Sequence, residues 1–188
     1  MSKKLLLGIF MSALLSGCGS SDGGGTVMFN TVNITASAES AKNPLLADLA
    51  TWSDEVNRCN SATATVSNEI VNFNVVSTKS ISTGTASNLM LQKATIIFTP
   101  GDTLTPALPA QLATTYQDLV GQTVLPGSTL SVPVEVVTHN LKLNFNPCSV
   151  VPVYTYNVKV LFDAIEAGTG KSGTIQAGMT VRIADFAD

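Results

Sequence analysis

The sequence contains a single histidine, His139, and this scarcity removes several kinds of active site at once. Neither a zinc site built on several histidines nor a haem with two histidine ligands can be assembled from one imidazole. A Walker loop is missing as well. We therefore expect no enzyme: no catalytic residue, no metal site and no cofactor. His139 lies beside Asn140 at the end of an expected strand, and we interpret it as an ordinary exposed residue.

Charge is also sparse. Charged residues make up 12% of the chain and the formal net charge is −3, whereas soluble domains typically carry about 25% charged residues. A mildly acidic chain without a basic run has no electrostatic footprint for nucleic acid, so we expect no nucleic acid partner. Acidic residues form three local groupings: Asp54-Glu55, Asp163 with Glu166, and Asp185 with Asp188. None has the dense alternation of a calcium loop, and we interpret them as solvated acids, with calcium binding or catalysis as the alternatives.

No apolar run is long enough to cross a bilayer. The run from Leu5 to Leu15 falls well short of the roughly 20 residues that a spanning helix needs. It follows the basic pair Lys3-Lys4 and precedes small residues, which is the build of a secretory signal peptide. We expect residues 1–17 to be a signal peptide that is removed and takes no part in the fold.

The residues around the expected cleavage site carry a resemblance. Leu15-Ser16-Gly17-Cys18 resembles the lipobox of bacterial lipoproteins, and an ordinary signal with a chance cysteine is the alternative. The resemblance implies a diacylglycerol on the Cys18 thiol, which would hold the protein on a membrane. In such lipoproteins Asp after the cysteine often accompanies retention on the inner membrane. Since Gly19 follows Cys18 here, the resemblance also implies an anchor in the outer membrane, on its periplasmic or its cell-surface face. Residues 18–25 have the Gly/Ser composition of a flexible tether.

Cysteine is rare, and this scarcity favours one pairing. Once Cys18 carries lipid, Cys59 and Cys148 remain. In an oxidising compartment two remaining thiols most simply form a disulfide. Closing a loop of about 90 residues would contribute on the order of 4 to 5 kcal/mol in the chain-entropy model. A metal or redox pair is the alternative, but no C-x-x-C pairing or nearby histidine supports it.

Apolar alternation predicts strands in most of the chain. The expected strands cover residues 27–38, 62–77, 89–98, 129–138, 150–165 and 174–186. Proline and glycine mark turns between them at 99–102, 125–128 and 168–170. Residues 124–134 resemble a hairpin of bacterial Ig-like domains. We predict one all-β domain over residues 26–188, an antiparallel Ig-like β-sandwich of about seven strands, with Pro133 at an edge or bulge.

Two segments depart from this alternation. Residues 44–56 and 109–120 space their apolar residues by three and four, which predicts one or two short helical insertions. Trp52 in the first segment is interpreted as a cap on the core beside Cys59, with an aromatic ligand platform as the alternative. The candidate binding residues are Trp52, Tyr116, Tyr154 and Tyr156.

Three functions stay open at this stage. The leading hypothesis is a non-catalytic structural or protein-interaction module of the cell envelope, anchored through Cys18 and engaging an envelope protein by a sheet edge or loops. The second is a ligand-binding or carrier lipoprotein with an apolar pocket near the four aromatic residues. The third is an enzyme of a type that no motif reveals, which would need clustered polar residues in one cleft.

We predict that the intact mass of the non-reduced mature protein is unchanged by alkylation, because the Cys59–Cys148 disulfide leaves no free thiol. After reduction, two thiols should become alkylated. Alkylation of both thiols without reduction would exclude the disulfide.

Overall fold

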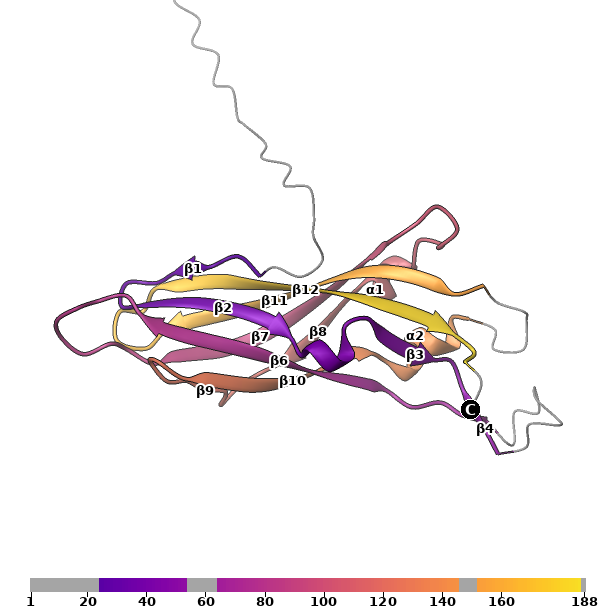
Figure 1. The fold of residues 1–188 in the computed structure, drawn as a ribbon, viewed down its shortest axis with the longest axis horizontal. Helices are drawn as coiled ribbons and strands as arrows, with labels where there is room; N and C mark the ends of the chain where they lie inside the picture. The colour runs from indigo at the N-terminus through magenta and orange to yellow at the C-terminus, as the bar shows by residue number, and fades with distance from the viewer. Residues whose placement is uncertain (1–23, 54–63, 146–151, 187–188) are drawn as a thin grey trace, which may run out of the picture.

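The computed structural model describes residues 24–53, 64–145 and 152–186, which form an all-β sandwich (Figure 1). One sheet has the order β1-β2-β6-β10: Val27–Met28, Val32–Ala38, Glu69–Lys79 and Thr129–Val137. The other has the order β3-β12-β11-β7-β8: Leu45–Asp48, Ser172–Ala184, Tyr154–Glu166, Leu89–Pro100 and Thr114–Asp118. β9 (Thr123–Val124) also pairs with β7, and β4 (Thr51–Trp52) pairs with β5 (Ala64–Thr65). The two helices are short: α1 (Ala110–Ala113) and α2 (His139–Leu143).

The core forms because the strands alternate apolar and polar residues. In β6, Val71, Phe73 and Val75 are buried while Asn72 between them is exposed. Successive side chains of a strand point to opposite faces, so this alternation gives each sheet one apolar face. Phe73 of β6 meets Phe162 of β11 edge to face across the core, with ring centroids 5.6 Å apart. This contact joins the middle strands of the two sheets.

The strand order is that of an Ig-like sandwich. In chain order, β2, β6 and β10 correspond to strands A, B and E, and β7, β8, β11 and β12 correspond to C, C′, F and G. Antibody domains join strands B and F by a disulfide between the sheets. Here β6 and β11 are joined instead by the contact between Phe73 and Phe162.

The first part of the chain belongs to both sheets. β2 pairs antiparallel with β6, and the chain then crosses over through a short 3₁₀ turn, Ser40–Lys42, so that β3 pairs parallel with β12. The sandwich is therefore antiparallel except for this one edge strand. The crossing segment connects the two sheets along one side of the molecule.

The strand predictions are confirmed. Each of the six expected segments overlaps one of the long strands, and the turns at 125–128 and 168–170 lie between strands. The turn expected at 99–102 begins later, because β7 continues to Pro100. Pro133 lies in β10, which is an edge strand with a register shift between Glu135 and Val137. Two short helices are present, as expected, but only one lies in a predicted place.

The helix predicted over residues 44–56 is wrong for the part that the structure describes. Leu45, Ala47 and Leu49 are buried, whereas Leu46 is exposed, which is the alternation of strand β3. Leucines at these positions fit both a helical and a strand spacing, and the open edge of β12 supplies the hydrogen-bond partners that favour the strand.

Helix α1 is shorter than predicted, and helix α2 lies where no helix was predicted. The helix predicted over residues 109–120 is a single turn, α1, because the β-branched and aromatic run that starts at Thr114 continues as strand β8. Helix α2 follows β10 where the strand pattern was expected to end. Thr138 caps it, its hydroxyl accepting a hydrogen bond of 3.1 Å from the Leu141 N–H.

We predict that Phe73→Ala lowers the free energy of unfolding by about 3–5 kcal/mol, because it leaves a cavity between the sheets. Denaturant unfolding measures this loss. Met28→Ala, at an exposed position, is the control and should change stability by less than about 0.5 kcal/mol. A double-mutant cycle with Phe162→Ala should give a coupling of about 1 kcal/mol. Equal effects of Phe73→Ala and the control would contradict the packing role.

Candidate functional site

A groove lies along one side of the sandwich, between β8 of one sheet and β10 of the other. The contact between Phe73 and Phe162 places β6 opposite β11. The strand order then places β10 opposite β7, and no strand of the described residues lies opposite β8. The groove has a volume of about 320 Å³. We call it the edge groove; its lining includes Ile70, Thr115, Tyr116, Gln117, Pro133 and Glu135.

The side chain of Gln117 bridges the edge groove from β8 to β10. Its Nε2 donates to the Pro133 carbonyl at 3.0 Å, and its Oε1 accepts from the Glu135 N–H at 2.9 Å. In a parallel sheet, one residue bonds to the carbonyl and the N–H of residues two apart on the neighbouring strand. The Gln117 amide thus makes the bonds that the backbone of an additional strand would make.

Pro133 is placed where its missing N–H costs nothing. In a strand, the N–H and C=O of a residue point to the same side, and neighbouring residues alternate. Since the Pro133 carbonyl points to Gln117, its nitrogen also faces away from β6. Proline on the outer side of an edge strand limits unwanted pairing with other chains.

The side chains of β8 at the edge groove alternate between two faces. Thr115 and Gln117 pair with the buried residues Ile96 and Ala94 and face the groove, whereas Tyr116 pairs with Thr95 and lies on the outer face of the six-stranded sheet. Tyr116 is 67% exposed and Ile70 is 51% exposed. The Lys93 ammonium nitrogen lies 5.3 Å from the centre of the Tyr116 ring, within the range of a cation–π contact. The Glu135 carboxylate has no ion pair or hydrogen bond with any described residue, and neither has the buried hydroxyl of Thr115.

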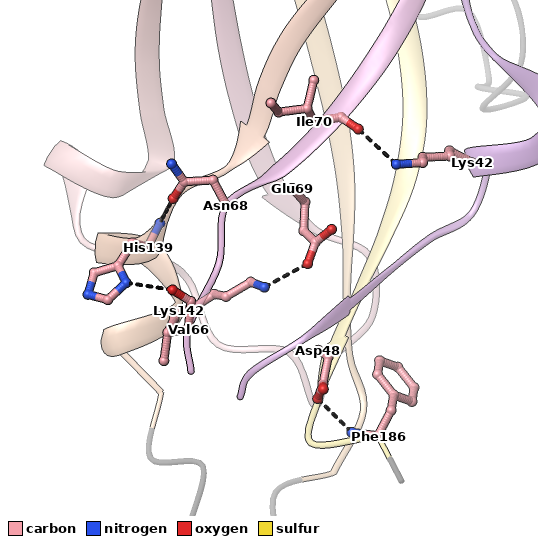
Figure 2. Close-up of polar contacts among 9 residues, drawn as sticks. All are labelled: Lys42, Asp48, Val66, Asn68, Glu69, Ile70, His139, Lys142 and Phe186. Atoms are coloured by element: carbon pink, nitrogen blue, oxygen red, sulfur yellow. Dashed lines mark hydrogen bonds and ion pairs between the residues drawn. The ribbon is translucent and has the colours of Figure 1, made fainter. Parts of the chain in front are cut away.

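A buried ion pair supports one end of the edge groove, near Thr138 (Figure 2). The side chain of Lys142 is 2% exposed, and its Nζ lies 2.7 Å from Glu69 Oε1. Removing an ammonium group from water is costly unless it is paired. The pair therefore fixes α2 against the first residues of β6, the strand that also carries Ile70.

The other polar contacts in Figure 2 each join a side chain to a backbone group. His139 donates its N–H to Asn68 Oδ1 at 2.6 Å, and its exposed ring nitrogen Nδ1 lies 3.1 Å from the Val66 carbonyl. Lys42 Nζ donates to the Ile70 carbonyl at 3.0 Å, and Asp48 Oδ1 accepts from the Phe186 N–H at 3.0 Å. These contacts fasten chain segments to one another. His139 is thus an exposed residue at a helix start and contacts no carboxylate among the described residues.

A buried carboxylate lies at the opposite end of the sandwich, where β11 turns into β12. Glu166 is fully buried. It accepts from the backbone N–H groups of Asn30 (3.2 Å) and Thr31 (2.8 Å) and from the hydroxyls of Thr31 and Thr169. Desolvation by burial raises the pKa of Glu166, but these hydrogen bonds outweigh it and lower the pKa below its ordinary value. Glu166 thus ties this turn to the loop before β2.

The four aromatic residues proposed from the sequence do not come together. Tyr116 pairs with Thr95 of β7, while Tyr156 pairs with Pro100, five positions along the same strand. Tyr154 and Tyr156 both approach Phe145, with ring centroids 5.4 and 6.4 Å apart. Of the four residues, Tyr116 borders the edge groove, with its side chain on the outer face of β8.

Tyr156 and Trp52 are buried, which separates them from any ligand surface. The Tyr156 hydroxyl donates to the Pro106 carbonyl at 2.8 Å, and burial, with smaller contributions from Tyr154 and Asp102, raises the pKa of Tyr156 to about 12. The Trp52 indole donates to Asp185 Oδ1 at 3.3 Å. Trp52 is interpreted from the sequence as a cap on the core beside Cys59; its side chain is buried, and Cys59 lies outside the described residues.

The sequence reasoning missed Gln117 and a glycine pattern. Nothing in the sequence marks Gln117, because its role depends on β10 lying beside β8. The pattern Gly168-x-Gly170-x-x-Gly173 is that of a dinucleotide-binding turn. Here it is the hairpin between β11 and β12, and a strand rather than a helix follows it. It therefore lacks the helix N-terminus that binds a pyrophosphate in such folds.

Several predicted residues lie outside the described part of the chain. These are Cys18, Cys59, Cys148 and the signal peptide of residues 1–17. Within residues 24–53, 64–145 and 152–186, no three His, Cys, Asp or Glu side chains gather as metal ligands would. The same ranges contain no helix with the length and apolarity to span a membrane.

The class that the fold and the edge groove define is an all-β sandwich with Ig-like strand order and one incompletely covered edge. No protein-family model, no curated protein and no solved structure matches the chain. Conclusions on function therefore rest on the residues themselves.

We predict that stability falls with acid in a way that depends on Glu166. Because folding lowers its pKa below the ordinary value of 4.5, the carboxylate stabilises the fold above that pH, and this stabilisation is lost as the pH falls through the folded-state pKa. Glu166→Gln should flatten the acid slope of the unfolding free energy and cost roughly 1–3 kcal/mol at pH 7.

Denaturant unfolding at a series of pH values measures both effects. Asp118→Asn, which removes an exposed carboxylate on β8, is the matched control and should keep the slope. A Glu166→Gln profile parallel to that of the wild type would refute the role of Glu166.

Proposed function

We propose that this protein is a lipid-anchored, non-catalytic interaction module of the cell envelope. In this proposal Cys18 carries the lipid in the outer membrane, residues 19–25 are the tether, and the sandwich engages an envelope protein at the edge groove. The observation that carries the proposal is the edge groove itself. A single glutamine side chain fills a strand position there, and the exposed residues Tyr116 and Ile70 lie on the outer faces of the two sheets that border it.

Exposed aromatic and aliphatic residues at such a place favour protein binding. Tyrosine is enriched at the centres of protein interfaces, since its ring buries a large area at a small entropy cost. A sheet edge with unpaired N–H and C=O groups is also a template for another chain, and some proteins bind peptides at such an edge. Tyr116 on the outer face of β8 supplies the first feature, and the free edge of β10 supplies the second.

The buried charged groups Glu166 and Lys142 stabilise the fold through their contacts. Glu166 is surrounded by four hydrogen-bond donors, and Lys142 is neutralised by Glu69. A catalytic acid or base needs access to a substrate proton, and both of these groups are buried against their partners. This arrangement supports a binding role more than a chemical one.

The carrier alternative has weaker support. A carrier needs an apolar cavity that surrounds most of its ligand. Tyr156 and Trp52 are instead packed away from solvent, and Tyr116 lies on an open surface. No observation on the described residues favours a carried ligand over a protein partner.

We predict that a photoreactive phenylalanine analogue at position 116 captures a defined envelope protein in intact cells. The same analogue at Leu46, an exposed residue on the opposite edge strand β3, should capture much less of it. Both captures are identified by mass spectrometry, and Cys18→Ala should abolish the capture at 116, because the protein then leaves its membrane.

Equal capture from positions 116 and 46 would exclude the edge groove as the contact. Capture that persists in Cys18→Ala would exclude the lipid anchor from the function. If neither position captures a protein above background, the proposal of a protein partner fails.

A further inference from the structure

We infer that the edge groove binds an extended segment of its partner as an added β-strand, which pairs with the free edge of β10 and displaces the Gln117 side chain. This inference rests on the proposed function, because it specifies the form of the partner at the same groove. Three features of the groove support a strand as its occupant: a vacant strand position, outward-facing hydrogen-bonding groups along β10, and an acidic side chain at its edge.

The first step is the vacant position. The six-stranded sheet extends one strand further on this side than the four-stranded sheet, since no strand of the described residues lies opposite β8. An Ig-like sandwich of the constant type has strand D at this place, beside strand E; here strand E corresponds to β10. A strand added about 4.8 Å from β10 would lie over β8. The volume of about 320 Å³ between β8 and β10 is the room left there.

The second step is the hydrogen bonding along β10. The Pro133 carbonyl and the Glu135 N–H both point away from β6 and are held by one side-chain amide. By strand alternation, Ser131 presents its N–H and C=O on the same outer side, and neither has a partner among the described residues. An incoming strand would satisfy all of these groups, whereas Gln117 reaches only two. The exchange therefore gains backbone bonds and gives up the two bonds of the Gln117 amide.

The third step is the chemistry of the segment. Glu135 has a carboxylate without a partner in the described chain, so a Lys or Arg on the incoming strand would complement it. Ile70 is exposed on the outer face of the four-stranded sheet, the face that an apolar side chain of the incoming strand would share. The buried Thr115 hydroxyl, which has no hydrogen-bond partner in the described part of the chain, faces the same space. The occupant is therefore an alternating strand of another protein with at least one basic residue.

The test uses ten-residue peptides selected from a displayed random library on the protein purified from its cells. The selected peptides should alternate apolar residues with Lys or Arg. On binding, amide exchange followed by NMR should slow at least tenfold at Ser131. Val132 and Val134, whose amides face β6 by the same alternation, should change little.

The decisive variant is Gln117→Ala. It removes the side chain that competes for β10, so the selected peptides should bind about tenfold tighter, the expected gain for one or two net hydrogen bonds. Gln176→Ala, at an exposed glutamine of β12, is the matched control and should leave affinity unchanged. Glu135→Gln should weaken binding several-fold and remove the preference for basic residues. Thermal unfolding of each variant shows whether it is folded.

The outcomes separate this inference from the proposed function. If position 116 captures a partner in cells but Gln117→Ala weakens peptide binding or Ser131 stays unprotected, strand addition is wrong and the groove still binds protein in another way. A library that yields no binder beside a successful capture in cells also overturns strand addition. Sedimentation that shows concentration-dependent dimers through the groove would identify a second copy of this chain as the occupant and overturn the inference of a foreign strand. Failure of both capture and selection overturns the groove as a binding site.

Discussion

The contact between β6 and β11 is the constraint on which the other features depend. Phe73 and Phe162 meet edge to face between the two sheets, and the alternation of both strands places their remaining apolar residues on the same inner faces. Packed sheets lie about 10 Å apart because their side chains interdigitate at that distance. Once the two middle strands are fixed in this way, the strand order determines which outer strands lie opposite one another and which one has none.

The two sides of the sandwich differ for this reason. On one side the chain crosses from β2 to β3 and connects both sheets. On the other side β8 extends past β10, and Gln117 reaches back to the free edge. Pro133 and the carboxylate of Glu135, which has no partner among the described residues, both discourage indiscriminate pairing at such an edge. An edge that is accessible but limits pairing in this way favours a selective partner, in agreement with the proposed function.

The two ends of the sandwich are each fastened by a buried charged group. Glu166 ties the turn between β11 and β12 to the loop before β2, and Lys142 ties α2 to β6 through Glu69. Both charges are stabilised by partners distant in the sequence, so they depend on the complete fold. Groups held in this way specify one arrangement of the loops at each end.

The sequence by itself determined the all-β class, the six long strands and the edge position of Pro133. These features follow from local alternation and from the missing N–H of proline, which need no knowledge of neighbouring strands. The tertiary structure decided the rest. Residues 45–48 form a strand because β12 offers a free edge, although their leucines also fit a helix. Tyr154 and Tyr156, two residues apart in the chain, share a neighbour in Phe145, whereas Tyr116 is on another strand. Gln117 acquires its role from a strand that lies 16 residues away in the sequence, because hydrogen bonding across a groove depends on the meeting of two sheets and leaves no local pattern in the chain.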